Sequence, residues 1–324
     1  MKKIYLLVIM VACLTSEAQM EYPEVRIEAR VTDETGLAIS NAPASAWFRK
    51  LKTNNPFEGQ ESTWSKGVTD EKGIFIASSQ TLGLCGVGAE KEGYYVSRKE
   101  IRLGKHKEGK WIPWHQVVEL KLRKKGSPIP MYAKKLESLI LPVVASPVGY
   151  DLMAGDWVSP HGKGLISDIE FTLQREIRGN FDFDWQLTAK LPGEGNGLSA
   201  ILPSELAPES ELHFPRSAPA DGYAINDVVL GYKYSKSGIW ETNSTSSTNF
   251  FFRVRAEYDE NKHLRDALYG KLLGPIKVRV QGTKTAKLYF TYYLNPTSLD
   301  RNMEFEPKKN LFNILRFEEE VRDP

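Results

Sequence analysis

The chain has 324 residues, of which 41% are hydrophobic and 26% charged, with 43 basic and 41 acidic residues and a formal net charge of +2. This composition excludes a disordered, collagen-like or disulfide-scaffold protein, and the near balance of charge argues against a nucleic-acid partner, which requires a strongly basic surface. Single hydrophobic cores stop growing near this length, so we expect two domains.

The first residues, 1–18, are typical of a secretory signal peptide. Two lysines precede an apolar run from Ile4 to Leu14, and Ser16-Glu17-Ala18 has small residues at the spacing that signal peptidase recognises. We expect cleavage after Ala18, a secreted or periplasmic location and no transmembrane segment in the mature chain. The alternative is lipid anchoring through Cys13, because the residues before it loosely resemble a lipobox.

After such processing Cys85 is the only cysteine, so no intramolecular disulfide can form. It lies in the apolar stretch from Leu82 to Val87, where no basic neighbour would lower its pKa. This setting indicates a buried structural side chain rather than a reactive thiol.

Residues 20–125 are predicted to form a small β-sandwich. In the run from Val25 to Thr32, apolar residues at odd positions alternate with polar ones, the period of two that a half-buried strand requires. Turns rich in Asp and Gly separate this run from further candidate strands. The expected turns and strands lie at Asp33–Gly36, Ala42–Phe48, Thr69–Gly73, Ile74–Ile76 and Val118–Leu122.

The turn residues of this region resemble those of the carboxypeptidase regulatory-like domain, a relative of transthyretin-like and collagen-adhesin B-type sandwiches. The matching motifs are Val31-x-Asp33-x-x-Gly36, Ile39-x-x-Ala42, Thr69-Asp70-x-x-Gly73-x-Phe75 and Ala89-x-x-x-Gly93-Tyr94. The resemblance implies a seven-stranded Ig/transthyretin-like sandwich that serves as a spacer or accessory module without catalytic residues. Adhesin relatives form Lys–Asn isopeptide bonds, but Arg26 and Arg30 stand where that lysine would be sought, so we expect none.

The composition changes at Arg123–Pro130, which is first charged and then rich in Pro and Gly. We interpret 126–148 as a linker and lead-in segment, followed by a second β-rich domain at 149–324. Proline and glycine disfavour helix there, and strand patterns return in its last third. The whole chain is therefore predicted to be all-β, with a larger antiparallel sandwich or barrel-like domain after the first sandwich.

The clearest pattern in the second domain is a hairpin. Apolar residues occupy odd positions in 169–177 and again in 181–187, so both arms face one core only if a loop of odd length joins them. Arg178-Gly179-Asn180 is such a loop. The predicted register sets Glu176 opposite Asp182 and Gln174 opposite Asp184.

This hairpin gathers Glu176, Asp182 and Asp184 on its outer face, where like charges repel. A bound Ca²⁺ would offset the repulsion, since it prefers oxygen ligands. Basic side chains on a neighbouring strand would do the same, and we favour that interpretation. The candidate basic residues are Arg253, Arg255, Lys277 and Arg279.

Catalytic motifs are few, and we expect no cofactor. The five histidines are scattered, which does not favour a metal site. The best candidate cluster is Asp156, His161 and Asp168 around a glycine-rich turn, which is also explained as ordinary turn chemistry. The proline-rich stretch 190–223 is either a functional loop or a cover for one sheet.

Two function classes fit these observations. The first is a secreted or periplasmic accessory protein without catalysis that binds a polysaccharide or a cell-surface protein; the alternative is an extracellular, glycan-active hydrolase. For the first class, exposed indole rings would form the contact surface, because large rings give much contact area at little entropic cost. The candidate rings are Trp111, Trp114, Trp157 and Trp240, each of which would otherwise be core.

Overall fold

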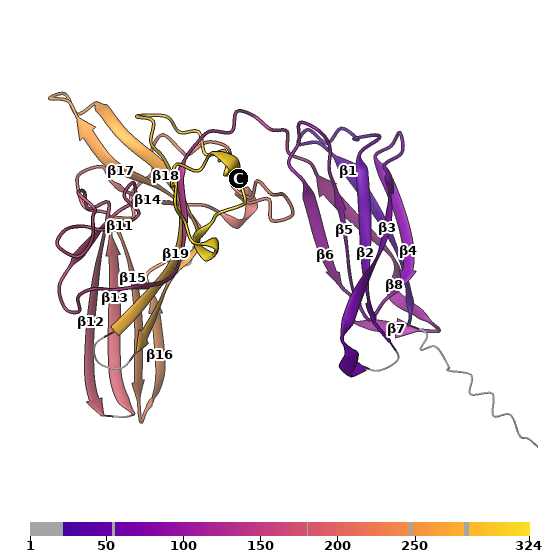
Figure 1. Cartoon of the computed structure of the whole chain (residues 1–324), viewed down its shortest axis with the longest axis horizontal. Coiled ribbons are helices and arrows are strands. Elements are labelled where there is room, and N and C mark those ends of the chain that lie inside the picture. Colours follow the sequence, from indigo (N-terminus) through magenta and orange to yellow (C-terminus); the bar gives the residue numbers. More distant parts are fainter. Residues whose placement is uncertain (1–21, 54–55, 180, 246–248, 282–284) are drawn as a thin grey trace, which may run out of the picture. The chain divides into compact units, whose positions relative to one another are not determined.

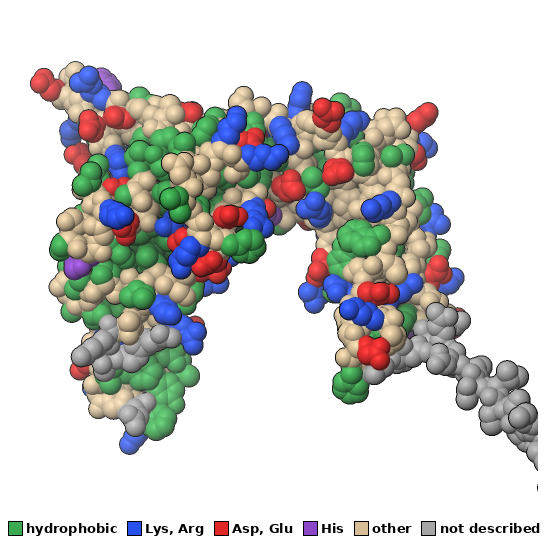
Figure 2. Space-filling view, viewed as in Figure 1, with side chains coloured by type: hydrophobic (Ala, Val, Ile, Leu, Met, Phe, Trp, Pro, Cys, Tyr) green, Lys and Arg blue, Asp and Glu red, His purple; other side chains and the backbone are tan. Residues whose placement is uncertain are grey.

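The computed structural model describes residues 22–324 except 54–55, 180, 246–248 and 282–284, so the predicted signal peptide and Cys13 lie outside the described residues. Strands make up 56% of the structure and helices 4%, which confirms the predicted all-β fold. The chain divides into two compact units between Leu122 and Arg123 (Figure 1; space-filling view in Figure 2). In the described part, no helix is long and apolar enough to cross a membrane.

The first unit is a β-sandwich of two four-stranded sheets, with strand orders β4-β1-β8-β7 and β3-β2-β5-β6. The described residues form eight strands rather than the predicted seven, because the short β7 pairs with the start of β8. The strands are β1 (Glu24–Thr32), β2 (Pro43–Leu51), β3 (Gln60–Val68), β4 (Ile74–Gln80), β5 (Leu84–Ala89), β6 (Ser97–Arg102), β7 (Lys105–Lys107) and β8 (Lys110–Lys121).

The core of this sandwich follows the predicted alternation. In β1 the odd-numbered residues from Val25 to Val31 are fully buried, and β1 lies between β4, which is antiparallel to it, and β8, which is parallel. Cys85 on β5 is also fully buried, and this burial raises the pKa of its thiol to about 12. The prediction that Cys85 is a buried side chain is therefore confirmed.

The second unit contains a six-stranded sheet, β11-β10-β12-β13-β15-β16, and a five-stranded sheet, β14-β17-β18-β19-β9 (Figure 1). Neighbouring strands within both sheets are antiparallel. The strands are β9 (Tyr132–Ile140), β10 (Val148–Asp151), β11 (Asp156–Trp157), β12 (Ile169–Gly179), β13 (Asp182–Lys190), β14 (Gly197–Ala200), β15 (Asp227–Ser235), β16 (Gly238–Asn243), β17 (Phe250–Tyr258), β18 (Leu264–Gln281) and β19 (Thr285–Asn295).

The five-stranded sheet has apolar side chains buried on both of its faces. One face joins the main core with the six-stranded sheet, and the other is covered by irregular segments that include residues 201–223. Phe250, Phe251 and Phe252 at the start of β17 are all buried, the continuous apolar run that a doubly covered strand requires. Phe214 from the covering stretch packs against Phe251 with ring centroids 6.3 Å apart. Most of 190–223 therefore acts as a cover.

The interpretation of 126–148 as a linker is wrong. Residues 132–140 form β9, which pairs with β19 at the edge of the five-stranded sheet. Just before it, Arg123 is buried and donates hydrogen bonds to the carbonyls of Leu212 and Phe214. The alternation of inward and outward side chains along β9 is interrupted at Ser138, where φ is 71°. A search of the sequence for alternating apolar and polar residues therefore did not reveal this strand.

The predicted hairpin is present, with a register that differs by two residues. Glu176 pairs with Asp184, not Asp182, because β12 continues through Gly179, which pairs with Asp182 after a bulge. A shift of two residues preserves the faces, so Phe171 and Phe183 stay on the same side of the sheet.

Candidate functional site

The predicted cluster of Asp156, His161 and Asp168 is not assembled. Asp156 accepts hydrogen bonds from the backbone N–H groups of Trp157, at 2.8 Å, and Lys163, at 2.9 Å, and so shapes the turn between them. His161 is exposed, whereas Asp168 is buried beneath Arg255. These residues thus support the turn interpretation.

Asp168 belongs to a buried charge network with Asp151 and Arg255. Arg255 donates to both oxygens of Asp168 and to one oxygen of Asp151, over distances of 2.8–2.9 Å. Burial raises the pKa of Asp168. Burial would also raise the pKa of Asp151, but hydrogen bonds from backbone N–H groups, led by that of Leu165, hold this pKa below its ordinary value. Each carboxylate oxygen accepts a hydrogen bond from the protein. The network therefore holds the 151–168 loop, and both of its carboxylates are engaged by hydrogen bonds from within the second unit.

The acidic hairpin face is neutralised from within the hairpin. The guanidinium of Arg178 lies 2.8 Å from Glu176 and 3.0 Å from both Asp182 and Asp184. The hydrogen bonds to Asp182 and Asp184 raise the pKa of Arg178. A salt bridge is thus observed, but the predicted donors on neighbouring strands do not supply it. Among the described residues, no three His, Cys, Asp or Glu side chains are arranged to hold a metal ion.

Two of the four candidate tryptophans are core residues, so the prediction of solvent-facing rings is wrong for them. Trp111 is 7% exposed and donates from Nε1 to the carbonyl of Thr81 at 3.3 Å. Trp157 is also buried, and it donates to the carbonyl of Ile140 while packing edge-on against Tyr150. Both rings satisfy their N–H groups inside the protein, as buried indoles usually do.

The other two tryptophans reach the surface to different degrees. Trp114 is half-buried, with the ammonium of Lys110 4.8 Å from its ring centre and Arg26 at 6.0 Å. Trp240 on β16 is 46% exposed, and the ammonium of Lys233 lies 5.9 Å from its ring centre. Of the four, Trp240 presents the most accessible ring.

Trp240 lines a groove of about 660 Å³ on the outer face of the six-stranded sheet, here called the Trp240 groove. Two rows of side chains cross β12, β13, β15 and β16 in register and form its surface. One row is Gln174, Gln186, Gly231 and Thr242, and the other is Glu176, Asp184, Lys233 and Trp240. Gly231 has no side chain, which deepens the groove between Gln186 and Thr242.

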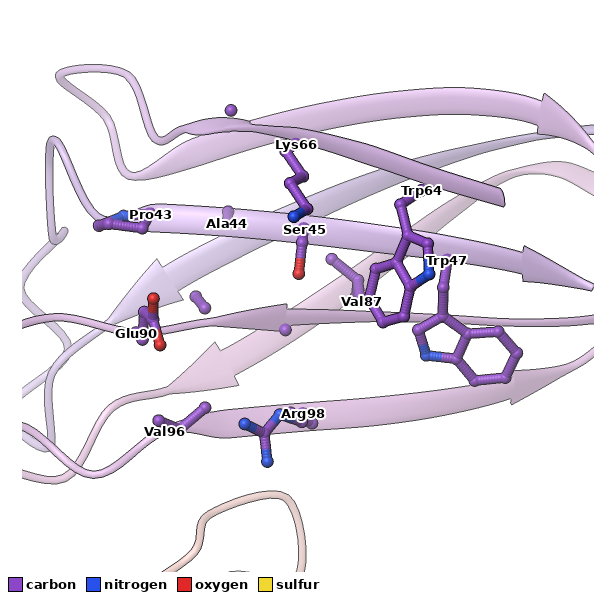
Figure 3. A pocket seen from close by; sticks show the side chains of 13 residues that line it. Pro43, Ala44, Ser45, Trp47, Trp64, Lys66, Val87, Glu90, Val96 and Arg98 are labelled. Carbon is purple, nitrogen blue, oxygen red and sulfur yellow. The ribbon is translucent and has the colours of Figure 1, made fainter. Parts of the chain in front are cut away.

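A second groove, of about 310 Å³, lies on the outer face of β3, β2, β5 and β6 in the first unit, and we call it the Trp47–Trp64 groove. Figure 3 shows the two indoles beside each other on β2 and β3, with Lys66 reaching over Ser45. We did not predict this site from the sequence. The signal was present, because the buried alanines of β2 occupy even positions and therefore place Trp47 on the outer face.

No family model and no curated protein matches the chain. Among solved structures, 3-chlorocatechol 1,2-dioxygenase from Rhodococcus opacus 1CP is similar over 34% of this chain and 62% of that chain, at 12% identity and a TM-score of 0.27. The shaft pilin SpaA from Lactobacillus rhamnosus GG is similar over 71% of this chain and 86% of that chain, at 11% identity and a TM-score of 0.21. The major pilin BcpA of Bacillus cereus is similar over 82% of this chain and 95% of that chain, at 9% identity and a TM-score of 0.24. Similarities this weak carry no argument about function.

Proposed function

We propose that this is an extracellular, non-catalytic accessory protein that binds a polysaccharide in the Trp240 groove. The observation that carries the proposal is the half-exposed indole of Trp240 beside a row of side-chain amides and a hydroxyl. The signal-peptide pattern of residues 1–18 supports the location.

The chemistry of the groove matches a chain of sugar rings. An indole offers a flat apolar surface for the C–H face of a pyranose, and it loses little side-chain entropy on binding. Gln174, Gln186 and Thr242 supply both donors and acceptors, which neighbouring sugar hydroxyls require. On the opposite face of the sheet, Trp185 and Tyr232 stack with ring centroids 6.0 Å apart and stiffen the platform.

The carboxylates in this groove favour binding over hydrolysis. A glycosidase places two carboxyl groups on either side of the scissile bond and keeps one of them protonated. Glu176 and Asp184 instead share the guanidinium of Arg178, at 2.8 and 3.0 Å. This arrangement is that of an ion pair, in which both carboxylates are held by one arginine.

The test is retention of the protein in native gels that contain neutral polysaccharides such as xyloglucan, galactomannan or β-glucan. Trp240→Ala should lose most of the retention shown by the wild type, and Gln186→Ala should weaken it. The matched control is Ile239→Ala, because Ile239 is 58% exposed on the same strand but on the other face of the sheet. Equal retention of the Trp240 and Ile239 variants, or release of sugar from the polymers, would contradict the proposal.

A further inference from the structure

We propose that the Trp47–Trp64 groove of the first unit is a separate binding site for an anionic polysaccharide, a chain of sugar rings that bear carboxylate or sulfate groups. The inference does not depend on the Trp240 groove, because different strands of a different unit carry it. It rests on two indoles and on cationic side chains on one sheet face.

The floor of the groove is shaped so that an indole lies flat on the sheet. Gly86 on β5 pairs with Trp47, and a Cβ at Gly86 would lie 2.6 Å from Nε1 of Trp47. A side chain at this position would therefore lift the ring. Glycine weakens a strand interior and often marks a close approach, and here its lack of a side chain lets the indole of Trp47 lie against β5.

Trp64 extends this apolar surface by one strand. It pairs directly with Trp47 across β2 and β3 and is 58% exposed. Adjacent strands lie about 4.8 Å apart, a step close to the length of one unit in a sugar chain. The two indoles can therefore contact successive rings of one chain that runs across the strands.

Cationic side chains flank the indoles. The next row across the sheet is Lys66, Ser45, Gly88 and Arg98, so an ammonium and a guanidinium border the groove. Beyond Trp47 on the same strand, the guanidinium of Arg49 lies 5.7 Å from the indole ring centre. Its buried Nε–H has no hydrogen-bond partner among the described residues. These groups match carboxylate or sulfate oxygens, with which guanidinium forms paired hydrogen bonds.

Acidic side chains on this face lie toward the margins. Glu90 is at one end of the groove in Figure 3, away from the indoles. Glu100, in the row of Trp47, has its carboxylate 2.7 Å from the guanidinium of Arg102. The charge next to the two rings is thus positive, and it complements an anionic ligand rather than a cationic one.

The geometry favours a polysaccharide over an acidic peptide. Peptides gain affinity on sheets chiefly by pairing with an unpaired edge strand. The groove instead lies on the face of the sheet, between the edge strands β3 and β6, and a peptide that lay across this face would find side-chain contacts alone. A sugar chain needs no backbone pairing, and it gains from ring stacking and charge pairing.

The test compares retention on polygalacturonate, alginate and chondroitin sulfate with retention on methyl-esterified polygalacturonate, which has the same chain without the charge. We expect the full chain to bind at least one anionic polymer, to bind the ester at least tenfold more weakly, and to be released as NaCl rises. Trp64→Ala and the double variant Lys66→Gln/Arg98→Gln should each lower retention about thirtyfold, the lower end of the range of an interface hot spot. Ile76→Ala is the control, because Ile76 is 46% exposed on β4 of the other sheet.

No retention on any of the anionic polymers, or full retention of the Lys66→Gln/Arg98→Gln variant, would overturn the inference. Equal retention on poly-glutamate would also overturn it, because charge without sugar rings would then suffice. Trp240→Ala should leave this binding unchanged, so a failure here is distinguishable from a failure of the Trp240 groove.

Discussion

Arg255 on β17 donates two parallel hydrogen bonds, each 2.8 Å long, to the carboxylate of Asp168, which lies 87 positions earlier in the chain. Arg255 has a φ of 55°, a left-handed conformation that is uncommon for a residue with a side chain. It lies where the pairing of β17 with β18 is irregular. The bulge turns this arginine toward the 151–168 loop, and the ion pair offsets the backbone strain.

Removing one partner of this pair should destabilise the second unit. Asp168→Asn removes one of the two buried carboxylates that neutralise Arg255 and leaves it only the carboxylate of Asp151, 2.9 Å away, so we expect a loss of about 3 kcal/mol in the free energy of unfolding. Urea denaturation followed by tryptophan fluorescence would measure it. Asp227→Asn, an exposed carboxylate on β15, is the control and should change stability little. A similar loss in both variants would contradict the role given to Asp168.

The buried Lys271 should make stability depend on pH. Burial, with a smaller contribution from the charge of Arg123, lowers the pKa of Lys271 to about 7. The unfolded chain therefore binds a proton that the folded chain lacks between pH 7 and about 10, and stability rises with pH in that window. We expect the wild type to gain about 2 kcal/mol relative to Lys271→Met between pH 7 and 9.

Paired denaturation curves at pH 7, 8 and 9 would measure this difference. The Nζ atom of Lys271 lies 4.4 Å from the ring centre of Tyr293 and donates a hydrogen bond to the carbonyl of Met303 at 2.9 Å. Since Lys271→Met disturbs these contacts at every pH, the slope with pH is informative and the absolute loss is not. Parallel curves for the two proteins would refute the assignment.

Calcium should not stabilise the wild-type hairpin, because the guanidinium of Arg178 already lies among the three carboxylates. We expect the same melting temperature in 5 mM CaCl₂ and in EDTA. Arg178→Gln removes the counter-charge, so its melting temperature should be lower and should rise when calcium is added. A clear calcium-dependent rise in the wild type would restore the metal interpretation.

The thiol of Cys85 should be protected in the folded protein. Burial both raises its pKa to about 12 and excludes reagents, so the reactive thiolate is scarce and inaccessible. In the chain that begins at Gln19, Ellman's reagent should label less than a tenth of the thiol before unfolding and all of it in guanidinium chloride. Rapid labelling under native conditions would show that the first sandwich opens locally.

The parts of the fold with a simple period were predictable from the sequence. The alternation from Val25 to Thr32 agrees with the observed burial throughout. The odd phase of 169–187 agrees at the base of the hairpin, but Ile177 and Phe181 near its tip are 48% and 68% exposed. The strand at 132–140 was not predictable in this way, because a bulge at Ser138 resets the period. A local pattern cannot show that β19, some 150 residues later, pairs with it.

The candidate site was less predictable, since exposure of a ring depends on what covers it. Trp240 is exposed because β16 is an edge strand and its outer face carries no further layer, whereas the ring of Trp111 lies under Gly83 and inside the first core. The sequence around Trp240 and around Trp111 gives no sign of this difference in exposure. The partner of the acidic hairpin was missed for a different reason, because Arg178 was assigned to the turn and its long side chain folds back over the carboxylates.

The parallel pairing of β1 with β8 has a mechanical consequence. These are the first and last strands of the first unit, and their paired residues run from Arg26 with His115 to Thr32 with Lys121. A pull on the two ends of this unit acts along the strands in opposite directions, so the hydrogen bonds of the pair bear the load together in shear instead of opening one by one. Forced unfolding is governed by the barrier to rupture, and this connection places that barrier at the β1–β8 pair.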